Sequence, residues 1–305
     1  MNPRIIQVRH ELSHEQAKRF KGLYLDRSHY DTVVGGGEED IDVITADSRW
    51  VLSYRYSPRL AAAAEKYLPA YLKIDGSVKG RGSAVYKDAV LPELRKDGTT
   101  SRCERMVSLP GLELARSVNI GYEAGNGRNP YAHPTKFVRE HPDVVRFLRR
   151  HMRLVDQESA RVAPQAQAAQ MQLARRIPDW THPGTSFSSW IYNNWWRTAG
   201  HYDRRMFGPS VLTSIIGGAI KPDSGRLIFP RHRVAVQLRT GSLLLANTAQ
   251  ELHGNDEILA VPGEEWWRVT LIGFLRPQLL KCGTRAVEEE KRQRFLEELK
   301  ERRAR

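Results

Sequence analysis

The chain has 305 residues, 40% of them hydrophobic, and its 48 Lys and Arg against 35 Asp and Glu give a formal net charge of +13. This length and apolar content suffice for one large domain with a buried core. Only two cysteines occur, Cys103 and Cys282, so the sequence excludes a disulfide framework and a cysteine-based zinc site. No apolar run approaches the roughly 18 residues of a transmembrane helix, so no membrane span is expected.

The first residues, Met1 to Arg4, lack the apolar segment of a signal peptide. We therefore expect an intracellular protein, cytoplasmic or, in a eukaryote, nuclear. The positive charge lies in the body of the chain, because the seven Lys and Arg of residues 287–305 nearly balance six Glu. A basic body fits a phosphate-backbone partner, and it fits a basic but merely soluble protein equally well.

Residues 1–180 are expected to form a mostly helical and loop region that packs on a later catalytic core and contributes to it. The Ala- and Leu-rich stretch from Tyr56 to Leu72 predicts a helix. Two glycine-containing stretches, 79–88 and 121–136, predict long loops. Apolar residues then recur at helical spacing from Val144, and an Ala- and Gln-rich run continues to Arg176, which predicts helix over 144–176.

From Phe187 the pattern changes to short strands separated by turn signals at 221–225 and 239–241. Strands are expected to begin within 187–196 and to flank the turn at 221–225, and the alternating apolar residues of 234–238 and 267–271 predict two more. Short strands at this spacing predict a double-stranded β-helix, a jelly-roll or cupin-like core, over residues 181–282. With supporting N-terminal helices and a charged C-terminal helix in residues 283–305, the predicted fold class is α+β.

Two histidines and a carboxylate stand within this strand-rich region. His201 and Asp203 are separated by one residue, and His253 lies beyond several predicted strands. Residues i and i+2 of an extended segment point to the same side, so the first pair can reach one metal if residues 196–203 are extended. Two imidazoles and one carboxylate leave three positions open on the metal, the facial arrangement of non-haem Fe(II) oxygenases. We therefore predict these three residues as iron ligands and as the catalytic centre.

The His-x-Asp spacing occurs three times, beginning at His29, His141 and His201, so its context must decide. No run of strands separates His29 from the next histidine. His141 directly precedes the predicted helix, where Asp143 suits a cap or a first-turn acid. Only His201 is followed by repeated short strands, a second histidine and a strand that carries an arginine.

That arginine is Arg268, which alternates with the apolar residues Trp267, Val269 and Leu271. Its planar guanidinium matches a carboxylate in a bidentate way, as the distal carboxylate of 2-oxoglutarate requires. Thr270 lies two residues on, shares the same face and offers a hydroxyl. The sequence therefore predicts Fe(II), 2-oxoglutarate as co-substrate, and O2.

Aromatic residues gather near the same strands. The tryptophans concerned are Trp190, Trp195, Trp196, Trp266 and Trp267. Core packing is the expected role for each, and stacking on a flipped base is the alternative. His232 is expected to be a hairpin residue and not a ligand.

Five runs of the sequence resemble the TET and J-binding-protein group of Fe(II)/2-oxoglutarate dioxygenases. They are Asn194–Asp203, Val211–Ile220, Gly225–Pro230, Val234–Leu245 and Leu252–Asn255. The resemblance covers about residues 185–276, a third of the chain. No cysteine-rich domain precedes this region, so the similarity is to the compact microbial, fungal or phage-type members.

This group hydroxylates the 5-methyl group of pyrimidines in DNA, acting on 5-methylcytosine in the TET enzymes and on thymine in the J-binding proteins. The resemblance implies iron ligation by His201, Asp203 and His253, and it implies that Arg268 anchors 2-oxoglutarate. It gives Asn194 or Thr270 a supporting polar role. DNA is the implied substrate, and no obligate protein partner is evident.

In this group the long loops commonly face the nucleic acid. The resemblance therefore implies that Lys79, Arg81 and Arg128 contact phosphates, and solvated loops are the equal alternative. Arg204 and Arg205, which directly follow Asp203, are two further basic candidates.

Our leading hypothesis is hydroxylation of a pyrimidine 5-methyl group in DNA. The first alternative is a 2-oxoglutarate-dependent hydroxylase of a protein side chain or a small metabolite. The second is a nucleic-acid-binding protein with a catalytically silent oxygenase fold.

Overall fold

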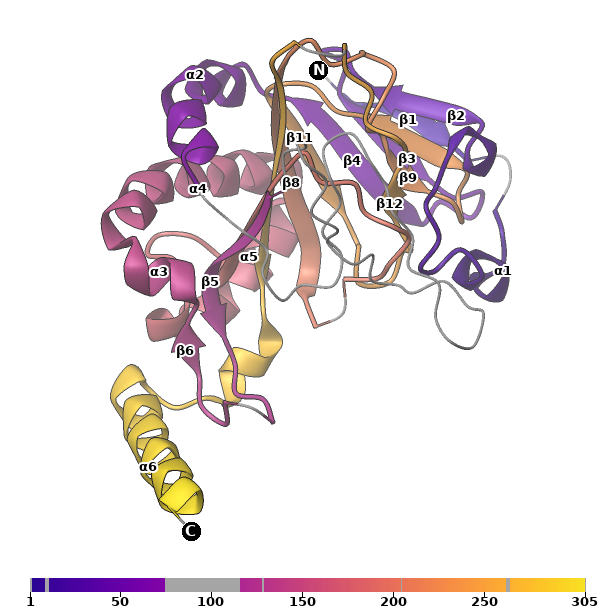
Figure 1. The fold of residues 1–305 in the computed structure, drawn as a ribbon. Coiled ribbons are helices and arrows are strands. Elements are labelled where there is room, and N and C mark those ends of the chain that lie inside the picture. Colours follow the sequence, from indigo (N-terminus) through magenta and orange to yellow (C-terminus); the bar gives the residue numbers. More distant parts are fainter. Residues whose placement is uncertain are drawn as a thin grey trace. The chain divides into compact units, whose positions relative to one another are not determined.

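The computed structural model describes residues 2–8, 11–74, 116–127, 129–203, 205–261 and 264–304 (Figure 1). The chain divides into two compact units. Unit 1 comprises residues 1–118, 191–204 and 209–272, and unit 2 comprises residues 119–190, 205–208 and 273–305. The predicted domain boundaries at residues 180 and 282 stay a prediction.

The larger sheet of unit 1 combines strands from both halves of the sequence. Its strand order is β1 (Arg4–Gln7), β3 (Ile41–Ile44), β4 (Trp50–Tyr56), β11 (Ser242–Ala246), β8 (Phe207–Gly218), β13 (Trp266–Leu275) and β7 (Ser189–Asn194). β11 lies between β4 and β8 and is antiparallel to both, with Leu244 opposite Tyr54 on one side and Leu212 on the other. β1 joins the edge in parallel to β3.

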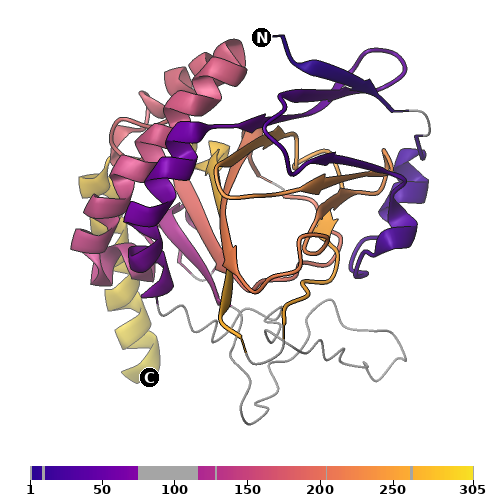
Figure 2. The ribbon, with the colours of Figure 1, turned by 90° about the horizontal axis from the view of Figure 1, so that it is seen from above.

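The smaller sheet has the order β12 (Gly254–Asn255), β9 (Leu227–Phe229), β10 (Val234–Gln237) and β2 (Thr32–Gly35). β9 and β10 form an antiparallel hairpin with Val234 opposite Phe229, and β2 pairs with β10 in parallel. Because β2 comes from the start of the chain, this sheet also depends on distant segments. Figure 2 shows the strands of unit 1 from above.

The core of unit 1 fills the space between these two sheets. Buried side chains of β3, β4 and β11 pack against those of β2, β9 and β10 in one apolar cluster. Both faces of β10 and β11 are largely buried. Removing apolar surface from water stabilises the fold on either face, so these two strands are apolar almost throughout.

The early part of the chain contributes strands to both sheets. Within the described part of residues 1–180, strands β1 to β4 join the two sheets of unit 1. Short strands such as β1 and β2 carry little periodicity of their own. Their place is decided by the partner strands that they pair with.

Unit 1 has two short helical turns and one longer helix within its described residues. α1 (His14–Lys18) begins with a capping box of Ser13 and Gln16, and η1 (Arg27–His29) is a single 3-10 turn. α2 (Pro58–Leu72) starts at the Ser57 cap with proline in its first turn, which confirms the predicted helix within 56–72.

Unit 2 is built mainly from helices. Its elements are β5 (Arg116–Glu123), β6 (His133–Pro134), α3 (Lys136–Glu140), α4 (Pro142–Val162), α5 (Pro164–Ala174), η2 (Pro178–Trp180), η3 (Pro277–Lys281) and α6 (Arg285–Ala304). The helix predicted over 144–176 is interrupted at Ala163, because Pro164 has no N–H and instead starts a new helix. α6 confirms the predicted C-terminal helix. Among the described helices, none is long and apolar enough to cross a membrane.

Candidate metal centre

Backbone pairing brings two distant parts of the chain together at the site. His201 and His253 lie opposite each other in an isolated antiparallel bridge, and each donates its backbone N–H to the other's carbonyl, at 2.9 and 3.0 Å. Asp203 donates its backbone N–H to the carbonyl of Thr248 at 2.9 Å. Within residues 196–203, only His201 takes part in a bridge.

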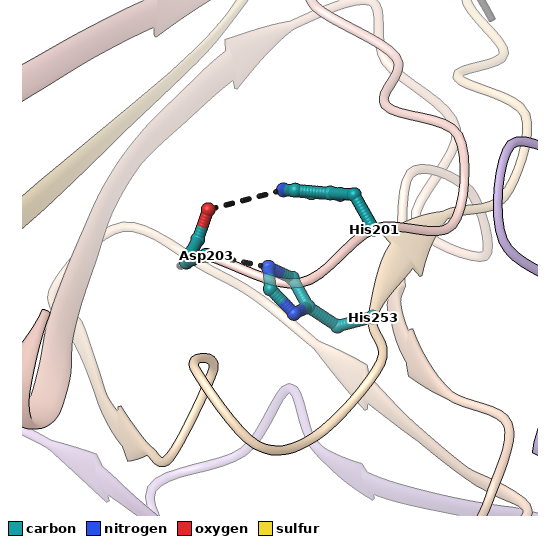
Figure 3. Close-up of side chains that lie close together, drawn as sticks. All are labelled: His201, Asp203 and His253. Carbon is teal, nitrogen blue, oxygen red and sulfur yellow. Dashed lines mark ion pairs between the residues drawn. The ribbon is translucent and has the colours of Figure 1, made fainter. Parts of the chain in front are cut away.

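The side chains of the three predicted ligands converge on one point (Figure 3). Asp203 lies between the two imidazoles, with Oδ1 3.3 Å from His201 Nε2 and Oδ2 3.3 Å from His253 Nε2. One ligand atom from each residue lies within 4.8 Å of the others. Such spacing is compatible with three atoms that share a single ion.

Both imidazoles are oriented by backbone carbonyls. His201 Nδ1 lies 2.9 Å from the carbonyl oxygen of Ala199, and His253 Nδ1 lies 3.0 Å from that of Glu251. With Nδ1–H donated to a carbonyl, Nε2 of each ring faces the carboxylate side of the site and is the atom that a neutral ring would offer to a metal. This is the tautomer and the orientation that a metal-ligating histidine requires.

The electrostatics of the triad favour an ionised carboxylate. Burial acts to raise the pKa of Asp203, but the charges and hydrogen bonds of His253 and His201 outweigh it and hold the pKa well below its usual value. Burial likewise acts to lower the pKa of His201, and the hydrogen bond and charge of Asp203 outweigh it, so that pKa is raised. A carboxylate that stays anionic beside two imidazoles is a suitable ligand set for a divalent cation.

A second group of polar side chains lies around Arg268, which is only 2% exposed. Its backbone N–H donates to Asn194 Oδ1 at 3.2 Å, and its Nη2 donates to the carbonyl of Gly225. Arg268 Nε and Asn194 Nδ2 are both buried and have no hydrogen-bond partner. A buried donor without an acceptor destabilises the folded protein. These two donors lie on the neighbouring strands β7 and β13, where the carboxylate of a bound ligand could accept from both.

Arg268 retains its charge in this position. Burial lowers its pKa to about 10, and the nearby carboxylate of Asp256 acts in the opposite direction. Thr270 lies two residues further along β13, on the same face, and is also buried. The residues present therefore fit a bidentate 2-oxo acid: three metal ligands, a buried guanidinium, an amide donor and a hydroxyl.

The structure also locates the residues that competed with this site. His29 lies 2.8 Å from Asp26, and Asp31 pairs with Arg233. His141 is the N-terminal cap residue of α4, and Asp143 lies in the first turn of that helix, as predicted. Among the described residues, only the three predicted ligands form a cluster suited to a metal.

One of the five predicted nucleic-acid contacts lies within the described residues. Lys79, Arg81, Arg128 and Arg204 lie outside the described residues. Arg205 is described, is exposed and adopts a left-handed backbone conformation with φ of 73°. Its contact with DNA stays a prediction.

The tryptophans near the site have core roles. Trp190, Trp195, Trp196 and Trp266 are all at most 9% exposed, and Trp195 Nε1 donates to the carbonyl of Trp266 at 2.9 Å. Trp267 is less buried and points away from the face that carries Arg268. None of the four buried rings is placed to be freely available for stacking.

Sequence reasoning missed two features of the site. Gly225 adopts φ of +66°, and a Cβ added there would lie 2.7 Å from Arg268 Nε. The turn signal at 221–225 marked this glycine but gave no reason for it. His232 lies in the turn between β9 and β10 as expected, but it is fully buried, with Nε2 3.0 Å from Glu251 Oε2.

The chain is similar to several solved structures. The chain is similar to NgTET1 in complex with 5mC DNA, with a TM-score of 0.56 and 12% identity over 96% of this chain and 91% of that one. It also matches a putative 2OG-Fe(II) oxygenase family protein from Caulobacter crescentus (TM-score 0.36, 11% identity, 81% and 90% covered). A third match is a full-length Neurospora crassa protein in complex with alpha-KG (TM-score 0.33, 13% identity, 74% and 75% covered).

The first of these matches confirms the predicted α+β fold with a double-stranded β-helix core, and with it the similarity to the TET group that the sequence indicates. No protein-family model matches the sequence, and no curated protein matches it.

Proposed function

We propose that the protein is an Fe(II)- and 2-oxoglutarate-dependent dioxygenase that hydroxylates the 5-methyl group of a pyrimidine, 5-methylcytosine or thymine, in DNA. The observation that carries the oxygenase chemistry is the pairing of two sites in unit 1. One is the convergent set of His201, Asp203 and His253, and the other is the buried pair of unpartnered donors on Arg268 and Asn194.

Each residue has a distinct role in this proposal. The two histidine Nε2 atoms and the Asp203 carboxylate would hold the iron, while the carbonyls of Ala199 and Glu251 keep the rings in their tautomer. Arg268 and Asn194 would bind the distal carboxylate of 2-oxoglutarate, with Thr270 beside them. When bound, the iron and its co-substrate supply the oxidation: one atom of O2 enters the methyl group as a hydroxyl, and the other enters succinate as 2-oxoglutarate loses carbon dioxide.

The DNA substrate rests on separate support. The net charge of +13 lies in the body of the chain and suits a polyanionic partner. The structural likeness to NgTET1, a protein whose structure was determined with 5mC DNA, points in the same direction. The basic body weighs only modestly against a hydroxylase of proteins or small metabolites.

A nucleoside assay tests this proposal. The protein is incubated with Fe(II), 2-oxoglutarate, O2 and duplex DNA that is either methylated or unmethylated at cytosine, and the digested nucleosides are measured by mass spectrometry. A hydroxymethyl product on 5-methylcytosine or thymine, formed together with succinate, supports the proposal. The absence of any oxidised pyrimidine, while succinate is still released, contradicts the DNA substrate and favours the metabolite or protein alternative.

A ligand variant distinguishes an active oxygenase from a nucleic-acid-binding protein with a catalytically silent fold. His201→Ala removes one ligand and should abolish both products, whereas succinate release that this change does not reduce would show that the site is not the source of the reaction. Arg239→Lys serves as a control, because Arg239 pairs with Glu38 at 3.8 Å and stacks on Tyr56, outside the ligand set.

A further inference from the structure

Four separate segments of unit 1 meet in a charged cluster that neither the triad nor the Arg268 group includes. Its members are Glu11, Arg49, Arg231, His232 and Glu251, which we call the Glu251 network. Glu251 Oε1 lies 3.1 Å from Arg49 and 3.5 Å from Arg231, and its Oε2 lies 3.0 Å from His232 Nε2. Glu11 bridges the same two arginines, at 2.7 and 2.8 Å.

The centre of the network is buried. The side chain of Glu251 is 4% exposed and that of His232 is fully buried, while the two arginines reach the surface. Removing a carboxylate from water is costly unless partners surround it, and here two guanidinium groups and an imidazole do so. A buried ionic group held from several sides has little freedom to move, so it can fix the position of the backbone that carries it.

That backbone touches two of the three predicted metal ligands. The carbonyl of Glu251 itself lies 3.0 Å from His253 Nδ1. Thr248, in the same turn, accepts the backbone N–H of Asp203 at 2.9 Å, and the turn is closed by the N–H of Glu251 on the carbonyl of Asn247, also at 2.9 Å. The short segment 247–251 is thus the common support of an imidazole and of the carboxylate-bearing residue.

The other side of the network reaches the same imidazole. Phe229, two residues before Arg231, lies with its ring 6.0 Å from the ring of His253. The end of β9 therefore packs Phe229 on His253, and the turn that follows places Arg231 and His232 against Glu251. A shift of this turn would alter both contacts together.

We propose that Glu251 is a positioning residue for the metal: its carboxylate, clamped by Arg49, Arg231 and His232, fixes the segment 247–251 whose carbonyls orient His253 and Asp203. This inference rests on the proposed function, because it assumes that the triad binds a divalent cation. Partners that orient metal ligands from behind typically contribute 10- to 100-fold to metal affinity, so about that loss is expected when the clamp is removed.

The test compares two buried glutamates. Glu251→Gln keeps the size of the side chain and removes its charge. Glu288→Gln does the same in unit 2, where Glu288 is 2% exposed and accepts from the backbone N–H groups of Ala132 and Gly283. Both changes should lower the melting temperature of the full chain, so stability alone does not distinguish them.

Metal binding does distinguish them. Co(II) is titrated into each full-length apo-protein without co-substrate or DNA, and its visible absorption reports both affinity and coordination geometry. We expect Glu251→Gln to weaken Co(II) binding by about 10- to 100-fold and to change the absorption bands. Glu288→Gln should leave both unchanged.

A second variant covers the case in which Glu251→Gln does not fold. Arg49→Gln removes the more exposed clamp and should weaken Co(II) binding in the same direction by a smaller factor. Wild-type affinity and wild-type bands in both variants would overturn the positioning role. The Co(II) titration measures no turnover, so it stays valid if the wild type binds Co(II) but oxidises no pyrimidine; that result contradicts only the proposed substrate. A wild type that binds no Co(II) overturns both the proposed function and the positioning role of Glu251.

Discussion

Replacing Arg268 by lysine is the most direct probe of the proposed co-substrate pocket. Arg268 is buried, gives Nη2 to the carbonyl of Gly225, and keeps Nε without a partner. Lysine preserves the charge, but it offers a single ammonium in place of a planar fork. The variant should therefore bind 2-oxoglutarate more weakly while the three metal ligands stay in place.

The size of the effect follows from the number of donors lost. A hydrogen bond that involves a charged group contributes about 1.5 to 3 kcal/mol, and Arg268→Lys removes at least one such bond to the carboxylate. Since 1.4 kcal/mol corresponds to a factor of ten, the dissociation constant for 2-oxoglutarate should rise by about 10- to 150-fold. The metal affinity should change by less than about threefold, because Arg268 is not one of the three proposed ligands.

Anaerobic calorimetry with Mn(II) in place of iron measures both constants without turnover. Arg239→Lys is the matched control, since it makes the same chemical change at an arginine that pairs with Glu38. A 2-oxoglutarate constant that rises by less than about threefold in Arg268→Lys would refute the pocket, since one charged hydrogen bond is the least that the geometry requires.

Three further outcomes are expected. Gly225→Ala should weaken 2-oxoglutarate binding by about tenfold, because the added Cβ would lie 2.7 Å from Arg268 Nε and the residue has a φ of +66°. Calorimetry measures this change, and Gly127→Ala is the control because a Cβ there meets nothing within 4 Å. Mn(II) at about 100 times its dissociation constant should raise the free energy of unfolding by about 2.7 kcal/mol, a gain that chelation reverses and that His253→Ala should lack in thermal melts. Burial acts to raise the pKa of Glu288, but hydrogen bonds from a lysine and from backbone amides outweigh it and lower the pKa below its ordinary value of 4.5. The stability that this carboxylate contributes is therefore present above pH 4.5 and lost as the pH falls through the folded-state pKa, so wild type should lose more stability on acidification than Glu288→Gln, and equal losses in denaturant titrations would contradict this assignment.

The sequence by itself identified the residues whose chemistry is local. The i, i+2 spacing of His201 and Asp203, the later His253, and the polar face of the strand that carries Arg268 and Thr270 are all visible in the residue pattern. The pattern also predicted the main helices, because capping residues, prolines and apolar periodicity act over a few neighbouring residues.

Other features depended on register between distant segments, and no local pattern encodes them. The bridge between His201 and His253, the pairing of early strands with later ones such as β4 with β11, and the amide of Asn194 beside the backbone of Arg268 arise only when the strands align. The Glu251 network is the clearest case, since its charged residues come from four separate places in the sequence.

The physical reason is the range of the forces involved. Helix formation and turn chemistry are decided by hydrogen bonds and torsions within a few residues, so they can be predicted from the sequence. Strand pairing and buried ion clusters gain their free energy from partners far along the chain, and which partners meet is decided by how the two sheets pack around their shared core. The chemical character of the site was thus present in the sequence, and the tertiary structure decided its supporting contacts.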